Sequence, residues 1–352
     1  MLSLKDRDWE SFFIENIATI ESGCDIYESE RRKGFTPYIS STSVNNGVVH
    51  FVDNNNSTRE SGCISVNRNG SVGYAFYHPY DALFSNDCRK LRLNHPSKYV
   101  GIFVAHQVTV QREKYSYGYK MGTGRLRRQS ILLPVSKPRT PDWNFMDDYI
   151  REREYFIIKN YIGYAKKVTK EICISNIDTL KQKEWREFNV LTYFTPRRGR
   201  ESNMSSLTNG NTALISAKKI NNGLKSFVSV PDERVHLGHT ITLNNDGDGG
   251  AGLAYYQPFS FALDTHVTSL RPNIEMSKYT LMFVASAITK QGERYGHGHS
   301  ISDTRLKKIK IMLPVKHDEL PDWEYMDKFA KQAVHQKLFL YLQYAEKYLG
   351  VH

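Results

Sequence analysis

Two hydrophobic patterns alternate along this chain of 352 residues. Short apolar runs separated by Asn- and Gly-rich turns predict β-strands within residues 1–140 and 177–320. Apolar residues spaced three and four apart predict a long amphipathic helix within 141–176 and another within 321–352. The pattern therefore predicts an α+β fold, in which each of two strand-rich domains is followed by a long helix.

This order of elements occurs twice because the sequence itself is duplicated. Residues 34–52 resemble residues 210–228, an offset of 176 positions (34 to 210), and the offset becomes 180 by Arg125 and Arg305 (125 to 305). Solenoid units repeat every 20 to 50 residues or so, which is much shorter. The duplication therefore predicts tandem domains with related functions.

The two copies predict matching elements. A short helix is expected near Tyr99 and again near Tyr279, where the apolar spacing is helical. The clearest predicted strands are 36–40, 48–52, 63–66 and 130–135 in the first copy, and 213–216, 225–228, 240–243 and 309–315 in the second.

Each long helix is expected to begin at a Pro-Asp-Trp sequence, with Pro141 or Pro321 at the first helical position. From Asp142 to Lys167 such a helix would extend about 39 Å, more than a small domain covers. The two helices are expected to pack antiparallel and to relate the copies by a pseudo-twofold axis. Packing of each helix on its own strand-rich domain is the alternative.

Composition adds a possible partner. The net charge is +11 and the isoelectric point is near 9.3, which favours a polyanion, and nucleic acid before a membrane. A merely basic surface is the alternative. No apolar run is long enough to span a membrane, and the N-terminus does not read as a secretory signal, so a cytoplasmic protein is expected. The four cysteines lack CxxC spacing and are expected to be reduced thiols.

The motifs of common enzymes are missing. The sequence has no P-loop, GxSxG, HExxH or Asn/Asp-Pro-Pro-Tyr motif, and the Gly-rich segment 247–252 lacks the Lys-Ser/Thr of a phosphate loop. His297 and His299 are spaced like metal ligands, but the first copy has Tyr117 and Tyr119 at these positions. We therefore expect no catalytic residues and no metal site.

Polar, basic and aromatic loops remain as candidates for function. Arg and Lys neutralise phosphates, Asn, Gln, Arg and His read base edges, and Tyr can stack. The predicted pairs of equivalent loops are 111–129 with 290–308, 67–71 with 244–248, and 28–33 with 196–200. The candidate DNA-binding residues of the first copy are Arg31, Arg32, Asn67, Arg68, Asn69, Lys114, Tyr115, Tyr117, Tyr119, Lys120, Arg125, Arg127 and Arg128. Those of the second copy are Arg197, Arg198, Arg200, Lys218, Lys219, Asn244, Asn245, Lys290, Arg294, Tyr295, His297, His299, Arg305, Lys307 and Lys308.

The copies match at apolar framework positions and differ in loop chemistry, which is typical of two domains that read different half-sequences. Ordinary solvated loops would be the alternative. The duplicated Ile-Ser-x-x-x-(Val/Ile)-Asn-Asn-Gly, the Gly-rich loop before Arg-Leu, the Leu-Pro-Val strand and the Pro-Asp-Trp-x-(Phe/Tyr)-Met helix start span nearly the whole chain. In these motifs the chain resembles specificity subunits of type I restriction–modification systems, and more closely the shorter ones of BcgI-type (type IIB) enzymes.

The resemblance implies a non-catalytic subunit with a target recognition domain in each copy, 1–140 and 177–320, and spacer helices within 141–176 and 321–352. Each domain would grip half of a bipartite site in double-stranded DNA. A DNA adenine methyltransferase or methyltransferase–nuclease subunit would dock on the chain and use S-adenosylmethionine and Mg²⁺. Type I helices usually start with a Leu-Pro-Pro-Leu-x-Glu-Gln-like sequence, which this chain lacks, so the type of system stays open.

Two other functions remain open from the residues alone. The chain could be a two-domain adaptor whose helices bind proteins while its strand-rich domains bind protein or glycan partners. It could also be a nuclease with an unrecognised site. A steep salt dependence of duplex binding would favour DNA recognition over the adaptor.

Overall fold

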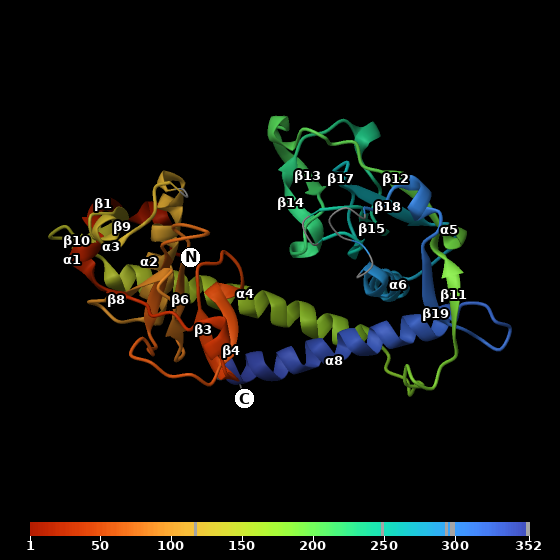
Figure 1. Ribbon diagram of the computed structural model, residues 1–352, viewed down its shortest axis with the longest axis horizontal. Helices are drawn as coiled ribbons and strands as arrows, with labels where there is room; N and C mark the ends of the chain where they lie inside the picture. The colour runs from red at the N-terminus through yellow and green to blue at the C-terminus, as the bar shows by residue number, and fades with distance from the viewer. Residues whose placement is uncertain (116–117, 248–249, 293–294, 296–299, 350–352) are drawn as a thin grey trace. The chain divides into compact units, whose positions relative to one another are not determined.

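The chain divides into two compact units, Met1–Tyr161 (unit 1) and Ile162–His352 (unit 2). The computed structural model describes residues 1–115, 118–247, 250–292, 295 and 300–349. Figure 1 shows that strands and short helices recur in the same order along the chain, and that each series is followed by a long helix. The predicted α+β fold is confirmed in each unit. The tandem duplication is confirmed because the same order of elements occurs in both units.

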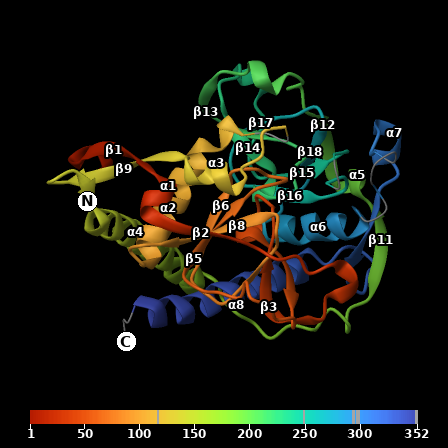
Figure 2. The ribbon, with the colours of Figure 1, turned by 60° about the vertical axis from the view of Figure 1, so that its left-hand side comes forward.

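Unit 1 is built from three small sheets, ordered β1-β9-β10, β2-β8-β5-β6 and β4-β3-β7. Its strands are β1 (Asp8–Phe13), β2 (Ala18–Ser22), β3 (Lys33–Ile39), β4 (Val48–Val52), β5 (Cys63–Asn67), β6 (Ala75–His78), β7 (Leu83–Phe84), β8 (Cys88–Leu93), β9 (Ser130–Ser136) and β10 (Thr140–Pro141). Its helices are α1 (Ile14–Ile17), α2 (Lys98–Val110), α3 (Thr123–Arg127) and the first part of α4 (Trp143–Glu171). Figure 2 shows these elements from a second side.

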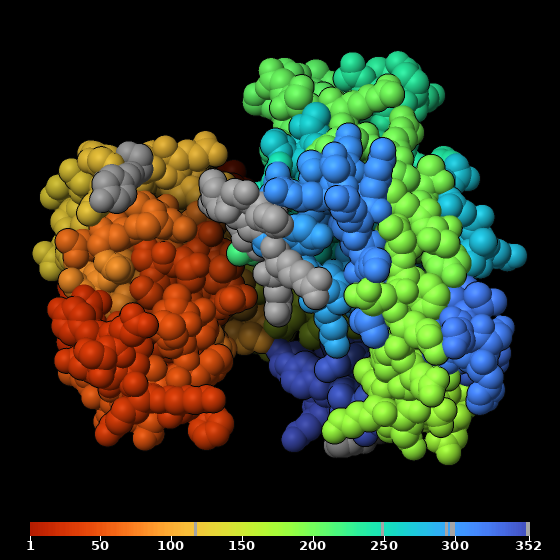
Figure 3. Space-filling model, turned by 45° about the vertical axis from the view of Figure 1, so that its right-hand side comes forward, coloured from red at the N-terminus to blue at the C-terminus, as the bar shows by residue number. Residues whose placement is uncertain are grey.

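Unit 2 repeats the plan with sheets ordered β11-β19, β12-β18-β15-β16 and β14-β13-β17. Its strands are β11 (Trp185–Asn189), β12 (Phe194–Arg198), β13 (Asn209–Ile215), β14 (Leu224–Val228), β15 (Thr240–Asn244), β16 (Ala254–Gln257), β17 (Phe261–Leu263), β18 (Val267–Pro272) and β19 (Lys310–Pro314). Its helices are the last part of α4, α5 (Val190–Tyr193), α6 (Lys278–Gln291), α7 (Asp303–Leu306) and α8 (Trp323–Leu349). On the surface of unit 2, yellow-green residues from near its start lie against blue residues from near its end (Figure 3).

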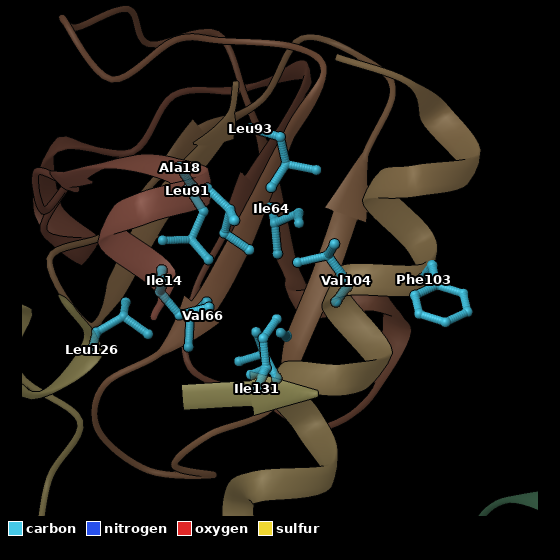
Figure 4. Close-up of a cluster of buried hydrophobic side chains, with 14 of the residues drawn as sticks. Ile14, Ala18, Ile64, Val66, Leu91, Leu93, Phe103, Val104, Leu126 and Ile131 are labelled. Carbon is cyan, nitrogen blue, oxygen red and sulfur yellow. The ribbon is translucent and has the colours of Figure 1, made fainter. Parts of the chain in front are cut away.

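The core of unit 1 lies between the four-stranded sheet and α2 (Figure 4). Ile64 and Val66 of β5 and Leu91 of β8 are fully buried and meet Val104 of α2. Each such side chain contributes about 1.5–3 kcal/mol when it leaves water. Unit 2 forms the equivalent core from residues that include Ile241, Leu243, Leu270 and Val284.

The duplicated Asn-Asn-Gly sequence forms a left-handed turn that requires these residue types. Asn45, Asn46 and Gly47 have φ values of 51°, 53° and 79°, and residues 221–223 of unit 2 have φ values of 54°, 50° and 82°. Asn and Gly tolerate the left-handed region better than other residues. A Cβ atom on Gly47 would lie 3.0 Å from the Ile39 Cγ2 atom. The turn therefore keeps this sequence in both copies while it joins β3 to β4 and β13 to β14.

The start of the long helices differs from the prediction. Pro141 pairs with Val135 in β10, and α4 begins only at Trp143. The Asp142 carboxylate accepts a hydrogen bond from the Phe145 amide at 3.0 Å and so caps the helix. Unit 2 repeats this cap, from the Tyr325 amide to Asp322 at 3.0 Å. The predicted proline at the first helical position was therefore wrong, and the aspartate carries the start signal.

Within unit 2, the last part of α4 packs antiparallel against α8 (Figures 1 and 2). Lys166 of α4 forms an ion pair with Glu346 near the end of α8 at 3.1 Å. Past the end of α4, the Asp178 carbonyl accepts a hydrogen bond from Tyr325 near the start of α8 at 3.0 Å. Antiparallel packing is confirmed for these segments. The pseudo-twofold axis and the domain division at residues 140 and 141 stay predictions.

Each long helix is also bonded to the strand-rich part of its own unit. The Ser97 hydroxyl caps α2, since it accepts from the Tyr99 and Val100 amides, and it donates to the Asp147 carboxylate of α4. In unit 2, Ser277 caps α6 in the same way and donates to Asp327 of α8. One serine in each copy thus joins the short helix to the long one.

Candidate nucleic-acid interface

The loops of unit 1 that carry basic residues converge at one end of its four-stranded sheet. We call this end tip 1; it comprises Ser22, residues 68–73, 85–89, 111–115 and 118–128. The Ser41 hydroxyl donates to the Asn69 carbonyl, and the Asn69 amide group donates to the Asp87 carboxylate. Arg89 Nε donates to the Thr123 hydroxyl at 2.8 Å. These contacts place segments that are far apart in sequence beside one another.

Unit 2 has the corresponding end, tip 2, which comprises residues 198–200, 218–219, 245–247, 250–252, 264–266, 290–292 and 300–306. Here His266 Nδ1 lies 2.7 Å from the Asp246 carboxylate, and Arg198 pairs with Asp303 at 2.7 Å. Arg200, two residues after Arg198, is exposed. Tip 1 and tip 2 therefore have the same architecture but different polar side chains.

Aromatic and basic side chains stack on one another at tip 1. The rings of Tyr115 and Tyr119 are stacked at 5.7 Å, and the Arg125 guanidinium lies 4.0 Å from the centre of the Tyr119 ring. Arg125 Nη1 also donates to the Lys120 carbonyl oxygen at 2.7 Å. Tyr119 is half-exposed. The loop therefore presents an aromatic face and a positive charge together, as a stacking or phosphate contact requires.

Arg305 makes the equivalent loop hydrogen bond at tip 2. Arg305 Nη1 donates to the Ser300 carbonyl oxygen at 2.6 Å, and the Arg305 amide donates to the Ser302 hydroxyl at 3.3 Å. The candidates Tyr117, Arg294, His297 and His299 lie outside the residues that the structure describes.

Other candidates are exposed or half-exposed and lie at or beside the tips. At tip 1 these side chains are Arg68, Lys114, Lys120, Arg127 and Arg128. At tip 2 they are Lys218, Lys219, Lys290, Tyr295, Lys307 and Lys308. Their number and sign make both tips positive, so each can attract a phosphate backbone.

Three candidate asparagines are buried, and the prediction that they contact DNA does not fit their positions. Asn67, the last residue of β5, donates to the Thr42 carbonyl at 2.8 Å, and Asn244, the last of β15, donates to the Lys218 carbonyl at 3.3 Å. The Asn245 side chain bonds with Thr268 at 3.0 Å. All three are at most 1% exposed. They hold the turns of the tips from inside.

The predicted pairing of loop 28–33 with 196–200 was wrong. Arg198 ends β12 as Ser22 ends β2, so residues 196–200 correspond to the end of β2. Arg31 and Arg32 lie before β3, whose other end is the one near Ser41, about 20 Å away at 3.3 Å per residue. The structure therefore does not bring Arg31 and Arg32 to tip 1.

Arg31, Arg32 and Arg197 are bonded within their own units. Arg31 donates to the Ile26 carbonyl at 3.0 Å, and Arg32 donates to the Asp53 carbonyl at 3.0 Å. Side chains alternate between the faces of a strand, and Arg197 points away from its neighbour Arg198. It donates to the carbonyl oxygens of Glu233 at 2.7 Å and Val235 at 3.2 Å.

Behind tip 1, unit 1 carries a cluster of charged side chains around one buried lysine. Lys90 of β8 is 4% exposed and pairs with Glu60 at 2.5 Å and Glu21 at 3.1 Å, while Arg92 pairs with Glu60 at 2.6 Å. Burial alone would raise the pKa of Glu60, but hydrogen bonds from Arg92 and Lys90 outweigh it and hold that pKa below its ordinary value. At the equivalent positions unit 2 has Ser269 and His236, joined by a hydrogen bond at 2.8 Å.

Each unit also has a buried hydrogen bond between the third residue of one strand and the last residue of the next. In unit 1 it joins Ser65 to His78 at 2.8 Å, and in unit 2 it joins Thr242 to Gln257 at 3.0 Å. Burial lowers the pKa of His78 to about 4, and burial together with nearby Arg197 and Arg200 lowers the pKa of His236 to about 4. Both histidines are therefore neutral and structural at neutral pH.

The sequence of each unit matches a family of known domains. The family described as the type I restriction modification DNA specificity domain matches residues 6–162 and again residues 182–340. The chain belongs to this family. The two matches cover most of the chain, and the predicted resemblance to specificity subunits is confirmed.

One relative of this specificity-domain protein is the specificity subunit of the type II restriction enzyme BcgI from Heyndrickxia coagulans. It is 39% identical over 158 residues, which are 44% of this chain and 46% of the relative. The match therefore spans about half the length of that relative.

Two solved structures are also similar to the chain. The S subunit of the type I restriction-modification system of M. genitalium matches with a TM-score of 0.49 at 15% identity, over 98% of this chain and 94% of that one. The HsdS subunit of Thermoanaerobacter tengcongensis matches with a TM-score of 0.32 at 13% identity, over 96% and 91%.

The specificity domains contain functional candidates that the sequence did not reveal. Arg89 is buried in β8 yet reaches tip 1, and Arg112, which lies in the predicted loop 111–129 but was not among its named candidates, lies over the Tyr74 ring at 5.3 Å. His266 follows a loop, and its hydrogen bond to Asp246 raises its pKa above the ordinary value. Arg89 and His266 lie at strand ends, outside the predicted Gly- and Tyr-rich loops.

The described residues contain no group of three His, Cys, Asp or Glu side chains close enough to hold a metal ion. Among those same residues, no helix combines the length and apolar character that a membrane span requires. All four cysteines are unpaired thiols, and burial raises the pKa of Cys63 and of Cys88 to about 12, which makes these two unreactive.

Proposed function

We propose that this chain is the sequence-reading subunit of a restriction–modification complex and that each specificity domain reads one half of a bipartite DNA site through its tip. The carrying observation is that the two tips share one architecture and differ in side chains. The turn after Asn67 and the turn after Asn244 are held by equivalent bonds, whereas the next contact is Asn69–Asp87 in one unit and Asp246–His266 in the other. Two tips with the same backbone arrangement but different polar side chains are suited to reading two different base sequences.

The residues before each long helix, 1–140 and 177–320, would form the two recognition domains. The helices within 141–176 and 321–352 would separate them and dock the methyltransferase or methyltransferase–nuclease subunits. Large apolar side chains on these helices support this role, because Ile157 of α4 is 70% exposed and Leu340 of α8 is 52% exposed. The partner subunits would use S-adenosylmethionine and Mg²⁺, so the chain itself would be non-catalytic.

The first test is a salt titration of duplex binding by the full chain. Each neutralised phosphate adds about −0.9 to the slope of log K against log salt, so several basic contacts at two tips should give a steep slope. A slope near zero would contradict DNA recognition and favour the adaptor. Under the same conditions, the isolated chain with S-adenosylmethionine and Mg²⁺ should neither methylate nor cleave the duplex. Cleavage by the chain alone would favour a nuclease.

The second test exchanges residues 1–140 for those of a related specificity subunit. Selection from randomised duplexes should then give a site in which one half has changed and the other half is the original. A change in both halves, or in neither, would contradict the assignment of one half-site to each domain.

A further inference from the structure

Each tip contains an arginine whose guanidinium donates hydrogen bonds to two equivalent positions, although the arginine comes from a different strand in each copy. At tip 1, Arg89 of β8 donates to the Thr123 hydroxyl at 2.8 Å and to the Asn86 carbonyl at 3.0 Å. At tip 2, Arg198 of β12 donates to the Asp303 carboxylate at 2.7 Å and to the Thr265 carbonyl at 3.3 Å.

The bonded partners are equivalent in the two units. Thr123 is the first residue of α3 and Asp303 is the first residue of α7. Asn86 lies two residues before β8, and Thr265 lies two residues before β18. In both units the arginine therefore joins the turn before one strand to the start of the short helix that carries Arg125 or Arg305.

The two arginines do not occupy equivalent positions. Each occupies one of the two facing positions in the same pair of neighbouring strands. Arg89 lies opposite Ser22 between β8 and β2, and Arg198 lies opposite Thr268 between β12 and β18. The arginine is thus on one strand in unit 1 and on its hydrogen-bonded neighbour in unit 2. Facing residues in such a pair lie about 5 Å apart, so a long side chain can reach the same acceptors from either strand.

Arg89 is nearly buried, whereas the side chain of Arg198 is 40% exposed. Arg89 also donates to the Cys88 carbonyl at 3.0 Å, so its hydrogen bonds are directed into the protein. A guanidinium is suited to this role because its planar fork can hold two acceptors at once, which a lysine cannot do with the same geometry.

We propose that Arg89 and Arg198 are positioning residues for DNA recognition, which tie α3 and α7 to the sheet and so fix the loops that meet DNA. This inference rests on the proposed function of the tips. If this is the role of the arginine, it can be moved to the neighbouring strand without loss of recognition, because only its hydrogen bonds to the short helix and to the turn are needed.

The experiment uses the full chain and selection from randomised duplexes. Arg89→Thr places in unit 1 the residue that unit 2 has at Thr268, and should lower the base preference at one half-site about tenfold, the cost of one wrong base pair. Preference at the other half-site should stay within about twofold. Arg59→Thr, which removes an exposed arginine at the opposite end of β5, is the control and should change neither half.

The decisive variant moves the arginine. Ser22→Arg with Arg89→Thr and Thr123→Asp copies the arrangement of unit 2 and should restore the preference to within about threefold of the unaltered chain, against the tenfold loss. Thermal unfolding of each variant shows whether it is folded. If the triple variant of unit 1 does not fold, the reciprocal variant of unit 2, Arg198→Ser with Thr268→Arg and Asp303→Thr, provides the test instead.

The outcomes separate the two proposals. If the unaltered chain selects no sequence, the proposed function itself is contradicted. If it selects a sequence and Arg89→Thr leaves the preference unchanged, Arg89 positions nothing. If the preference is lost but a folded variant with the moved arginine does not regain it, the role of Arg89 is a direct contact and the positioning role is overturned.

Discussion

The Arg305 guanidinium donates to the Ser300 carbonyl oxygen at 2.6 Å, and this bond closes the loop that precedes α7. Arg125 makes the same bond to Lys120 at 2.7 Å in the other copy. Both arginines are candidates for contact with DNA, and each uses one nitrogen to hold its own loop. A guanidinium has five N–H donors, so the remaining donors can bind a phosphate while the loop stays closed.

Arg125→Ala should weaken DNA binding and flatten its salt dependence. The substitution removes one positive charge and the stack on Tyr119, so the slope of log K against log salt should become less steep by about 0.9. Lys159→Ala, on the exposed side of α4, removes the same charge away from the tip and serves as the control. Equal slopes for Arg125→Ala and the unaltered chain would mean that this arginine only holds the loop.

His78→Gln should make unit 1 more resistant to acid. Burial lowers the pKa of His78 to about 4, so below pH 6.5 the unfolded chain takes up a proton that the folded chain refuses, and stability falls as the pH falls toward 4. Glutamine keeps the hydrogen bond, as Gln257 does with Thr242 in unit 2. The loss of unfolding free energy between pH 7.5 and 4.5 should shrink by about 1–3 kcal/mol.

Thermal or urea unfolding at both pH values measures this effect. His317→Gln, on the surface of unit 2, is the control and should leave the acid sensitivity unchanged. His236 still titrates in the same range, so some acid sensitivity should remain. An unchanged pH dependence in His78→Gln would show that His78 takes up its proton at the same pH in the folded and the unfolded chain.

The pKa of His266 should lie above the ordinary value of a histidine. Tip 2 should bind DNA more weakly when the pH rises and His266 loses its proton. The hydrogen bond to Asp246 raises the pKa of His266, so the ion pair is complete below pH 6.5 and is lost as the pH rises through the raised value. Loss of the positive charge should lower affinity for a duplex severalfold at low salt.

Nuclear magnetic resonance titration of the His266 ring measures this pKa. Asp246→Asn should lower the pKa of the His266 ring, and should shift the pH at which DNA affinity falls by the same amount. A ring that titrates at the same pH with and without the carboxylate would show that the pair does not form in solution.

Two glycine substitutions should change stability in opposite directions. Gly223 has a φ of 82°, and a Cβ there would lie 3.0 Å from Ile215 Cγ2, so Gly223→Ala should cost about 1 kcal/mol or more. Gly163 lies inside α4 with nothing within 4 Å of an added Cβ, so Gly163→Ala should add up to about 1 kcal/mol. Denaturant unfolding measures both. A neutral Gly223→Ala would show that the turn can relax.

Much of the fold could be predicted because the sequence states it twice. The strand at 48–52 and the helices near Tyr99 and Tyr279 depend on local periodicity, and both copies carry it. The helix start was misjudged because Pro-Asp fits two patterns, and only the pairing of Pro141 with Val135 decides between them. Strand ends cannot be located by local pattern, which is why Arg198 was aligned with the wrong loop.

The candidate site was predicted less well, because the type of a residue does not reveal whether its side chain points into the protein or toward solvent. Asn67 and Asn244 have the side chains of base readers, yet both point inward and bond a backbone carbonyl. Arg89 lies in β8 beside Lys90 and close to Arg92, and its neighbours in the sequence do not indicate that it, rather than they, reaches α3. Such assignments depend on contacts between segments about 30 residues apart, which one sequence does not show.

The Lys90 cluster limits how such chains can exchange parts in evolution. Lys90 finds its partners within its own unit, Glu21 on β2 and Glu60 before β5, and unit 2 replaces Lys90 and Glu60 together, by Ser269 and His236. A recombination that moved β8 alone into unit 2 would leave the buried Lys90 without a carboxylate, because His236 stands at the position of Glu60, and an unpaired buried charge costs several kcal/mol. Recombination that exchanges all the strands of a unit together leaves every such charge with its partner. Whole domains are therefore the units that recombination can exchange.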